Sequence, residues 1–130
     1  MNQMPEEALR AYVKAFETLA PDAVAPFYNV PCLFVSPQGT FAVSDPDGTR
    51  AMASQLIEQA RAQRYRRTEI LQLEVRRLAP TLASLTGVFV RYDVEDVELI
   101  RFGFAYTMLG TERGWRIVVA IAHDPPAPRP

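Results

Sequence analysis

His123 is the only histidine in this chain of 130 residues, and Asp124 follows it directly. An imidazole titrates near neutral pH, so His123 is the best candidate for a general acid or base. The alternative is a histidine that closes the end of a strand. We favour this structural role, because the sequence specifies no partner that would orient the ring.

The residues that must position His123 form a predicted β-hairpin. Residues 100–109 and 115–123 are rich in aromatic and β-branched side chains and flank a link with two glycines. Placing Gly110 opposite Trp115 gives both strands one bulky face, because side chains alternate along a strand. The sequence therefore predicts an aromatic face with the imidazole at its end. Its facing pairs are Met108–Ile117, Tyr106–Val119, Phe104–Ile121 and Phe102–His123.

Two more predicted strands, 68–78 and 82–92, extend this aromatic face. Their alternation pairs Val75 with Leu85 and Leu71 with Phe89, and the next turn brings Phe89 opposite Phe102. Aromatic residues at such spacings are more often core than ligand contacts, so both interpretations stay open. The residues that we expect to line a pocket are Tyr28, Phe34, Ser36, Phe89, Phe102, Phe104, Tyr106 and Trp115.

The same strand register places Glu69 opposite Arg91. The two side chains could bind a carboxylate ligand or form an internal ion pair, and we favour the ion pair. Ser36 and Gln38 either line the mouth of the pocket or cap a turn. Cys32 is the only cysteine, and we interpret it as a small buried hydrophobic residue. One histidine and one cysteine cannot make a His/Cys cluster, so we predict no metal site, and no feature indicates a cofactor.

Helical patterns come before most of the sheet. Apolar residues recur at helical spacing over 5–19, a short helix begins at Pro21, and a third helix is predicted over 49–62. Short strands are predicted at 30–36 and 40–43. The fold class is α+β: a cone-shaped roll of three N-terminal helices packed on a curved, mainly antiparallel sheet. We predict a single domain over 1–124 and a disordered, proline-rich tail over 125–130.

Composition limits the partners of this domain. Apolar residues make up 48% of the chain, the formal net charge is -1, and the basic residues are spread along the sequence. This distribution argues against nucleic-acid binding. We see no basic-then-apolar leader and no apolar segment long enough to cross a bilayer. The expectation is a cytoplasmic protein without membrane contact.

The order of elements resembles the nuclear transport factor 2-like (NTF2-like) superfamily, which includes ketosteroid isomerase, scytalone dehydratase and the SnoaL-like polyketide cyclases. The local matches are Leu19-Ala-Pro-Asp22, Gly48-Thr-Arg-Ala-Met52 and Gly114-Trp-Arg-Ile117, with His123 at the strand end. The resemblance covers most of the chain and implies the fold. It does not fix the activity, since this superfamily holds isomerases, dehydratases, cyclases, hydrolases and binding proteins.

The catalytic pattern of the steroid isomerases is only partly present. Their catalytic carboxylate precedes a proline at the end of the first strand, where this chain has Ser36, and a serine hydroxyl is no carboxylate base near pH 7. The resemblance makes Tyr12 a candidate catalytic residue, as the counterpart of the isomerase tyrosine on the first helix. It also implies a His–Asp pair at His123 and Asp124, as in the cyclases and the dehydratase.

Three functions follow from the sequence. The first is a protein that binds a small, largely apolar molecule in an aromatic-lined pocket. The second is a SnoaL-like isomerase, dehydratase or cyclase that uses His123 for proton transfer. The third is a dimeric interaction module without a ligand. A homodimer, which is compatible with either of the others, is predicted through the outer sheet face. That face is assigned to Thr86, Val88, Val90, Gly103, Ala105, Thr107, Val118 and Ala120.

Overall fold

The computed structural model describes residues 3–125, so residues 126–130 of the predicted tail lie outside the described part. The predicted helices and strands are all present, with bounds that differ by a few residues. In chain order the elements are α1 (Pro5–Glu17), α2 (Pro21–Val24), the 3-10 helix η1 (Ala25–Phe27), β1 (Tyr28–Ser36), β2 (Gly39–Val43), α3 (Pro46–Ala62), β3 (Tyr65–Ala79), β4 (Leu82–Asp93), β5 (Glu98–Thr111) and β6 (Gly114–His123).

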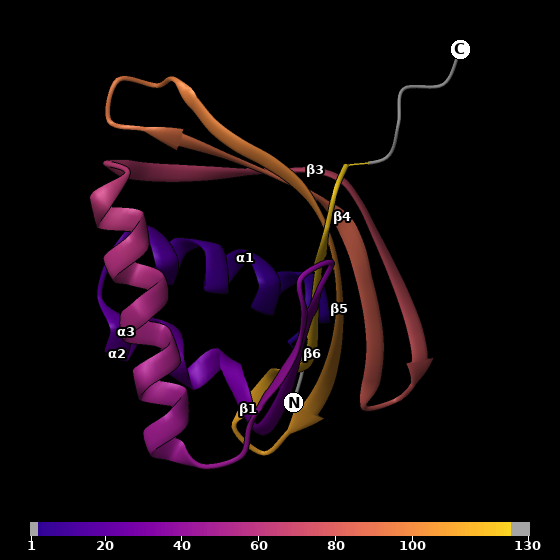
Figure 1. Cartoon of the computed structure of the whole chain (residues 1–130). Helices are drawn as coiled ribbons and strands as arrows, with labels where there is room; N and C mark the ends of the chain where they lie inside the picture. Colours follow the sequence, from indigo (N-terminus) through magenta and orange to yellow (C-terminus); the bar gives the residue numbers. More distant parts are fainter. Residues whose placement is uncertain (1–2, 126–130) are drawn as a thin grey trace.

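A six-stranded sheet in the order β2-β1-β6-β5-β4-β3 curves around the helices. All neighbouring strands are antiparallel except β1 and β6, which are parallel. Helices α1, α2 and α3 lie on the concave side of this sheet, as Figure 1 shows. The predicted α+β roll, with three helices packed on a curved and mainly antiparallel sheet, is therefore confirmed.

Local sequence signals explain where the two long helices begin. Proline is the first residue of both α1 and α3, a position where its missing N–H breaks no helical hydrogen bond. The Asp45 carboxylate precedes α3 and accepts a hydrogen bond from the Gly48 amide at 2.6 Å. Helix α1 then buries the predicted apolar stripe, which includes Leu9, Tyr12 and Phe16, against the sheet.

The register between β5 and β6 follows the prediction only near the turn. Gly110 pairs with Trp115 and Met108 pairs with Ile117, as expected. The register then shifts, because Val118 is an extra residue in β6. The predicted partners of Phe102, Phe104 and Tyr106 are therefore wrong. The observed pairs beyond the bulge are Tyr106–Ala120, Phe104–Ala122 and Gly103–His123.

A second irregularity lies between β3 and β4. Val75 pairs with Leu85 as predicted, but the register shifts between Leu71 and Glu74, where Gln72 has a φ of 54°. Leu71 therefore pairs with Val88 rather than with Phe89. Beyond the shift, Arg91 faces Thr68, and Glu69 faces Val90. The predicted pairing of Glu69 with Arg91 is wrong, since the two side chains now point to opposite faces of the sheet.

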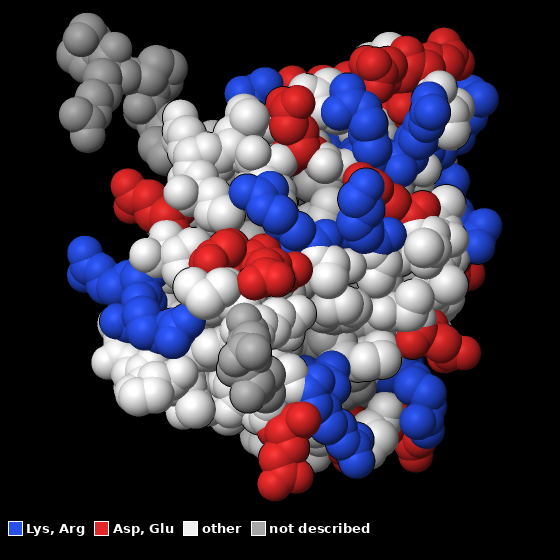
Figure 2. Space-filling view, turned by 180° about the vertical axis from the view of Figure 1, so that it is seen from behind, with Lys and Arg blue, Asp and Glu red and all other residues white. Residues whose placement is uncertain are grey.

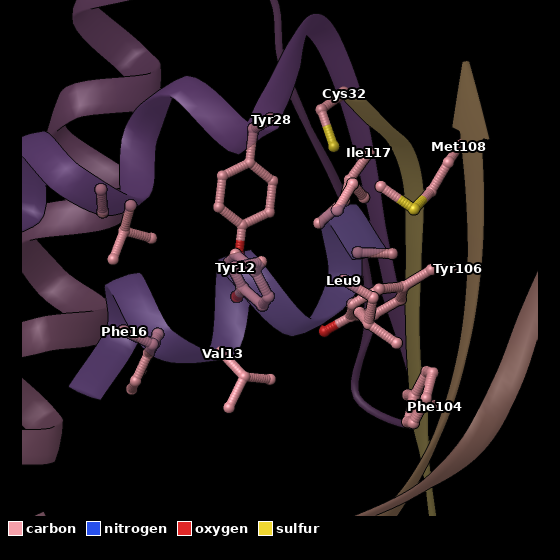
Figure 3. Packing of buried hydrophobic residues seen from close by; sticks show 14 of the residues in the cluster. Leu9, Tyr12, Val13, Phe16, Tyr28, Cys32, Phe104, Tyr106, Met108 and Ile117 are labelled. Atoms are coloured by element: carbon pink, nitrogen blue, oxygen red, sulfur yellow. The ribbon is translucent and has the colours of Figure 1, made fainter. Parts of the chain in front are cut away.

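The concave face of the sheet holds an aromatic core. Phe104 is fully buried and stacks on Phe89, with ring centroids 4.1 Å apart. Gly87, opposite Phe104, leaves room for this ring, because a Cβ atom at position 87 would lie 3.0 Å from it. Figure 3 shows side chains of α1, β1, β5 and β6 meeting in this core. The predicted inward face of β4 and β5 is confirmed here.

The surface carries charges of both signs. On the face seen in Figure 2, acidic and basic side chains are interspersed. Within residues 3–125, no helix is long and apolar enough to cross a membrane. The same residues contain no group of three or more His, Cys, Asp or Glu side chains that could hold a metal ion.

Candidate functional site

A cavity of about 270 Å³ opens on the concave side of the sheet. Aromatic side chains make up much of its wall, and its polar groups are few. Helices α1 and α3 supply Tyr12 and Leu56, while the other lining residues come from the β1–β2 hairpin and from β4, β5 and β6. These are Tyr28, Phe34, Val35, Ser36, Gly39, Phe41, Arg91, Phe102, Tyr106, Ala120, Ile121 and Ala122.

Three tyrosines converge at the inner wall of the cavity. The hydroxyl groups of Tyr12 and Tyr28 share a hydrogen bond, and the ring centroid of Tyr106 lies 6.4 Å from that of Tyr12. Figure 3 shows Tyr12 and Tyr28 pointing toward one another, from α1 and from the start of β1. All three side chains are buried, at 4%, 5% and 8% exposure.

Burial keeps these phenols neutral. It raises the pKa of Tyr12, and it raises the pKa of Tyr28 and of Tyr106 well above the usual value. The nearby Tyr12 adds to the pKa rise at the other two, because two phenolates close together would repel each other. The cluster therefore presents hydroxyl groups that donate and accept hydrogen bonds, and no phenolate near pH 7.

Arg91 supplies the cationic group of the cavity wall. Its guanidinium carbon lies 4.7 Å from the ring centroid of Phe16, 5.2 Å from that of Phe102 and 5.9 Å from that of Tyr65. The Arg91 Nε atom is buried and has no hydrogen-bond partner in the described part of the chain. The predicted internal ion pair with Glu69 is not formed.

Six of the predicted site residues line this one cavity, and the others do not. Phe89 and Phe104 lie in the core behind the cavity wall, where Phe104 has no exposed surface. Trp115 lies near the N-terminal end of the chain, and its indole donates a hydrogen bond to the Gln3 carbonyl at 2.9 Å. The predicted residues that do line the cavity are Tyr12, Tyr28, Phe34, Ser36, Phe102 and Tyr106.

His123 lies on the other side of the sheet. It pairs with Gly103, and a Cβ atom built on Gly103 would lie 2.1 Å from His123 Cε1, so the imidazole covers this glycine. The ring is exposed, and its Nδ1 lies 2.6 Å from the Asp124 carbonyl oxygen. The prediction that His123 ends the aromatic face is wrong, because the bulge at Val118 turns the side chain outward.

The same bulge explains two of the cavity residues that the sequence did not reveal. It turns Ala120 and Ala122 inward, where the predicted register placed Val119 and Ile121. The small alanine side chains leave the space that the larger residues would fill. Phe41 was also missed, although it stacks on Phe34 with ring centroids 4.7 Å apart. Its place within the predicted strand 40–43 was the only available signal.

A larger hollow of about 710 Å³ lies near η1 and the β5–β6 turn, and Tyr28 borders both it and the smaller cavity. Charged side chains of both signs line it, including Asp22, Glu112 and Arg113. Arg50, also in its wall, is paired with Asp47. Tyr28 is the one aromatic side chain that lines this hollow among the described residues, so we place the candidate site in the smaller, aromatic-walled cavity.

Comparison with known proteins identifies the family. A model of the family described as NTF2-like protein (DUF6841) matches residues 4–125. Comparison with curated proteins gives no match. Among solved structures, an NTF2-like protein of unknown function from Shewanella oneidensis is 17% identical, with a TM-score of 0.72 over 93% of this chain and 100% of that one.

Two further structures show the same architecture. A cystatin-like domain of unknown function from Nostoc punctiforme is 15% identical, with a TM-score of 0.71 over 93% of this chain and 75% of that one. An NTF2-like protein from Novosphingobium aromaticivorans is 14% identical, with a TM-score of 0.70 over 90% of this chain and 77% of that one. At these identities the structures establish the fold alone. Because the family model covers nearly the whole chain, this protein belongs to the NTF2-like family DUF6841.

Proposed function

We propose that the protein binds a small, largely apolar molecule in the aromatic cavity. The observation that carries this proposal is the cavity of about 270 Å³ walled by Phe34, Phe102 and Tyr106. Ligand pockets are typically concave and mainly apolar, with a few converging polar groups. Liquid water takes about 30 Å³ per molecule, so this space suits an organic molecule with on the order of ten non-hydrogen atoms.

Binding fits the lining of the cavity better than proton-transfer catalysis does. Among the described residues, those that line the cavity include no histidine, carboxylate, lysine or cysteine. The buried tyrosines stay protonated near pH 7 and therefore provide no general base. His123 lies across the sheet from the cavity, so the SnoaL-like enzyme hypothesis lacks its proton carrier at this site.

The proposal can be tested with 3-phenylpropanol, a neutral probe of suitable size. We expect saturable binding to the purified protein by isothermal titration calorimetry, with a dissociation constant between about 10 µM and 1 mM for a ligand of this size. Ala122→Phe fills the cavity from β6 and should abolish this binding. Ala79→Phe makes the same exchange at an exposed position of β3 and should leave the binding unchanged.

The outcome that contradicts the proposal is equally specific. If 3-phenylpropanol does not bind, or binds equally to the wild-type protein and to a folded Ala122→Phe variant, the cavity is not a binding site for apolar molecules. Circular dichroism and urea unfolding of both variants establish whether they are folded.

A further inference from the structure

Arg91 brings a positive charge to the cavity wall, and its buried Nε–H has no acceptor within residues 3–125. The neighbouring rings of Phe16, Phe102 and Tyr65 attract a cation through their faces, but they do not replace a carboxylate oxygen as a hydrogen-bond acceptor. Arg91 as a whole is half-buried, but its Nε atom is fully buried, and a buried donor without a partner lowers stability. The arrangement is therefore costly unless an anion binds there.

The carboxylates near Arg91 are directed elsewhere. Glu69 faces Val90 on the other side of the sheet. Glu17 uses its Oε2 atom to accept a hydrogen bond from the Thr68 amide at 3.1 Å. Within residues 3–125, the arginines that form salt bridges are Arg50, Arg64, Arg67 and Arg101.

The rest of the cavity wall determines which kind of body the anionic ligand carries. Phe34, Phe41 and Tyr106 provide an apolar wall, which a bare inorganic anion would leave unfilled. A guanidinium group binds both oxygens of a carboxylate through two parallel N–H donors, and low-dielectric walls strengthen this attraction. Building on the proposed function, we propose that the ligand is a small carboxylate with an aryl or alkyl body, whose anionic group binds Arg91.

A matched pair of probes tests this inference separately from the proposed function. We would measure the binding of 3-phenylpropanoate and 3-phenylpropanol to the wild-type protein at about pH 7 and low chloride. A charge-assisted, bidentate contact should favour the carboxylate by about tenfold or more. Arg91→Gln should lose this preference and bind both probes about as the wild-type protein binds the alcohol. Arg91→Lys keeps the charge without the planar fork and should show an intermediate preference.

The control is Arg101→Gln, which removes an exposed arginine of β5 that pairs with Glu98. It should leave the preference for the carboxylate unchanged. Equal affinities of the wild-type protein for the two probes would overturn the inference, and this comparison requires no variant. A preference that persists in a folded Arg91→Gln protein would also overturn it. If the alcohol still binds and Ala122→Phe still blocks it, the proposed function stands while the carboxylate assignment fails.

Discussion

The hydrogen bond between Tyr12 and Tyr28 gives a quantitative test of the inner cavity wall. Changing either tyrosine to phenylalanine removes one hydroxyl and leaves the other buried without this partner. An unsatisfied buried hydroxyl lowers the free energy of unfolding by about 1–3 kcal/mol. The double variant removes both hydroxyls, so neither is left without its partner. Its free energy of unfolding should fall by only about 0.5–1.5 kcal/mol, which is the net contribution of one hydrogen bond.

The assay is urea unfolding at about pH 7, followed by circular dichroism. With a slope of about 1–3 kcal/mol per molar urea, a loss of about 2 kcal/mol lowers the midpoint by about 1 M. The coupling energy of the double-mutant cycle should be about 1–3 kcal/mol. Tyr92→Phe is the matched control, because this half-buried tyrosine has no hydroxyl hydrogen bond within the described residues, and it should change stability by less than about 0.5 kcal/mol.

Additive effects of the two single changes would refute this reasoning. Additivity within about 0.5 kcal/mol would mean that the two hydroxyls act independently, each with water or another partner. The converging tyrosines would then not form one connected polar group in the cavity wall.

Three further predictions concern the sheet. Gly103→Ala should lower the free energy of unfolding by about 1 kcal/mol in the wild-type protein, because the new methyl group displaces His123. The same change should have almost no effect in a His123→Ala background. Equal losses in the two backgrounds, measured by urea unfolding, would mean that the imidazole does not cover Gly103. Burial raises the pKa of Tyr65 and of Cys32 to about 12, so the folded state keeps protons that the unfolded chain releases. Their contribution to the free energy of unfolding should therefore be complete below about pH 9 and should fall as the pH rises toward 12. Each group should lower it by up to about 1.4 kcal/mol per pH unit. A free energy of unfolding that does not change over this range would contradict the prediction. We also propose a homodimer through the outer sheet face without Ala120, which the bulge turns into the cavity. Its sedimentation mass should be twice the 14.6 kDa of the chain, and Thr107→Arg should reduce this mass to that of the monomer. A wild-type monomer at about 10 µM would contradict the proposal.

The predicted side-chain directions depended on alternation, and they were right where alternation is unbroken, although two of the inward residues, Phe89 and Phe104, lie in the core behind the cavity wall. Phe102 and Tyr106 lie on one regular stretch of β5, so their common inward direction followed from the period of two. Arg91 was assigned to the correct face of β4, but its partner was wrong, because the irregularity at Gln72 in β3 shifts Glu69 outward. A bulge inserts one residue and reverses every side-chain direction beyond it.

The sequence by itself determined the α+β order, the starts of the first two helices and the aromatic inner face. These features arise from local patterns, namely helical and strand periodicity, proline positions and turn residues. Only the tertiary structure decided that His123 faces outward, that Ala120 and Ala122 open the cavity and that Arg91 is not paired with Glu69. The residues 117–121 are apolar throughout, so their pattern contains no signal for the extra residue at Val118. Its position depends on how β6 fits between β5 and the parallel strand β1, which is a property of the folded sheet.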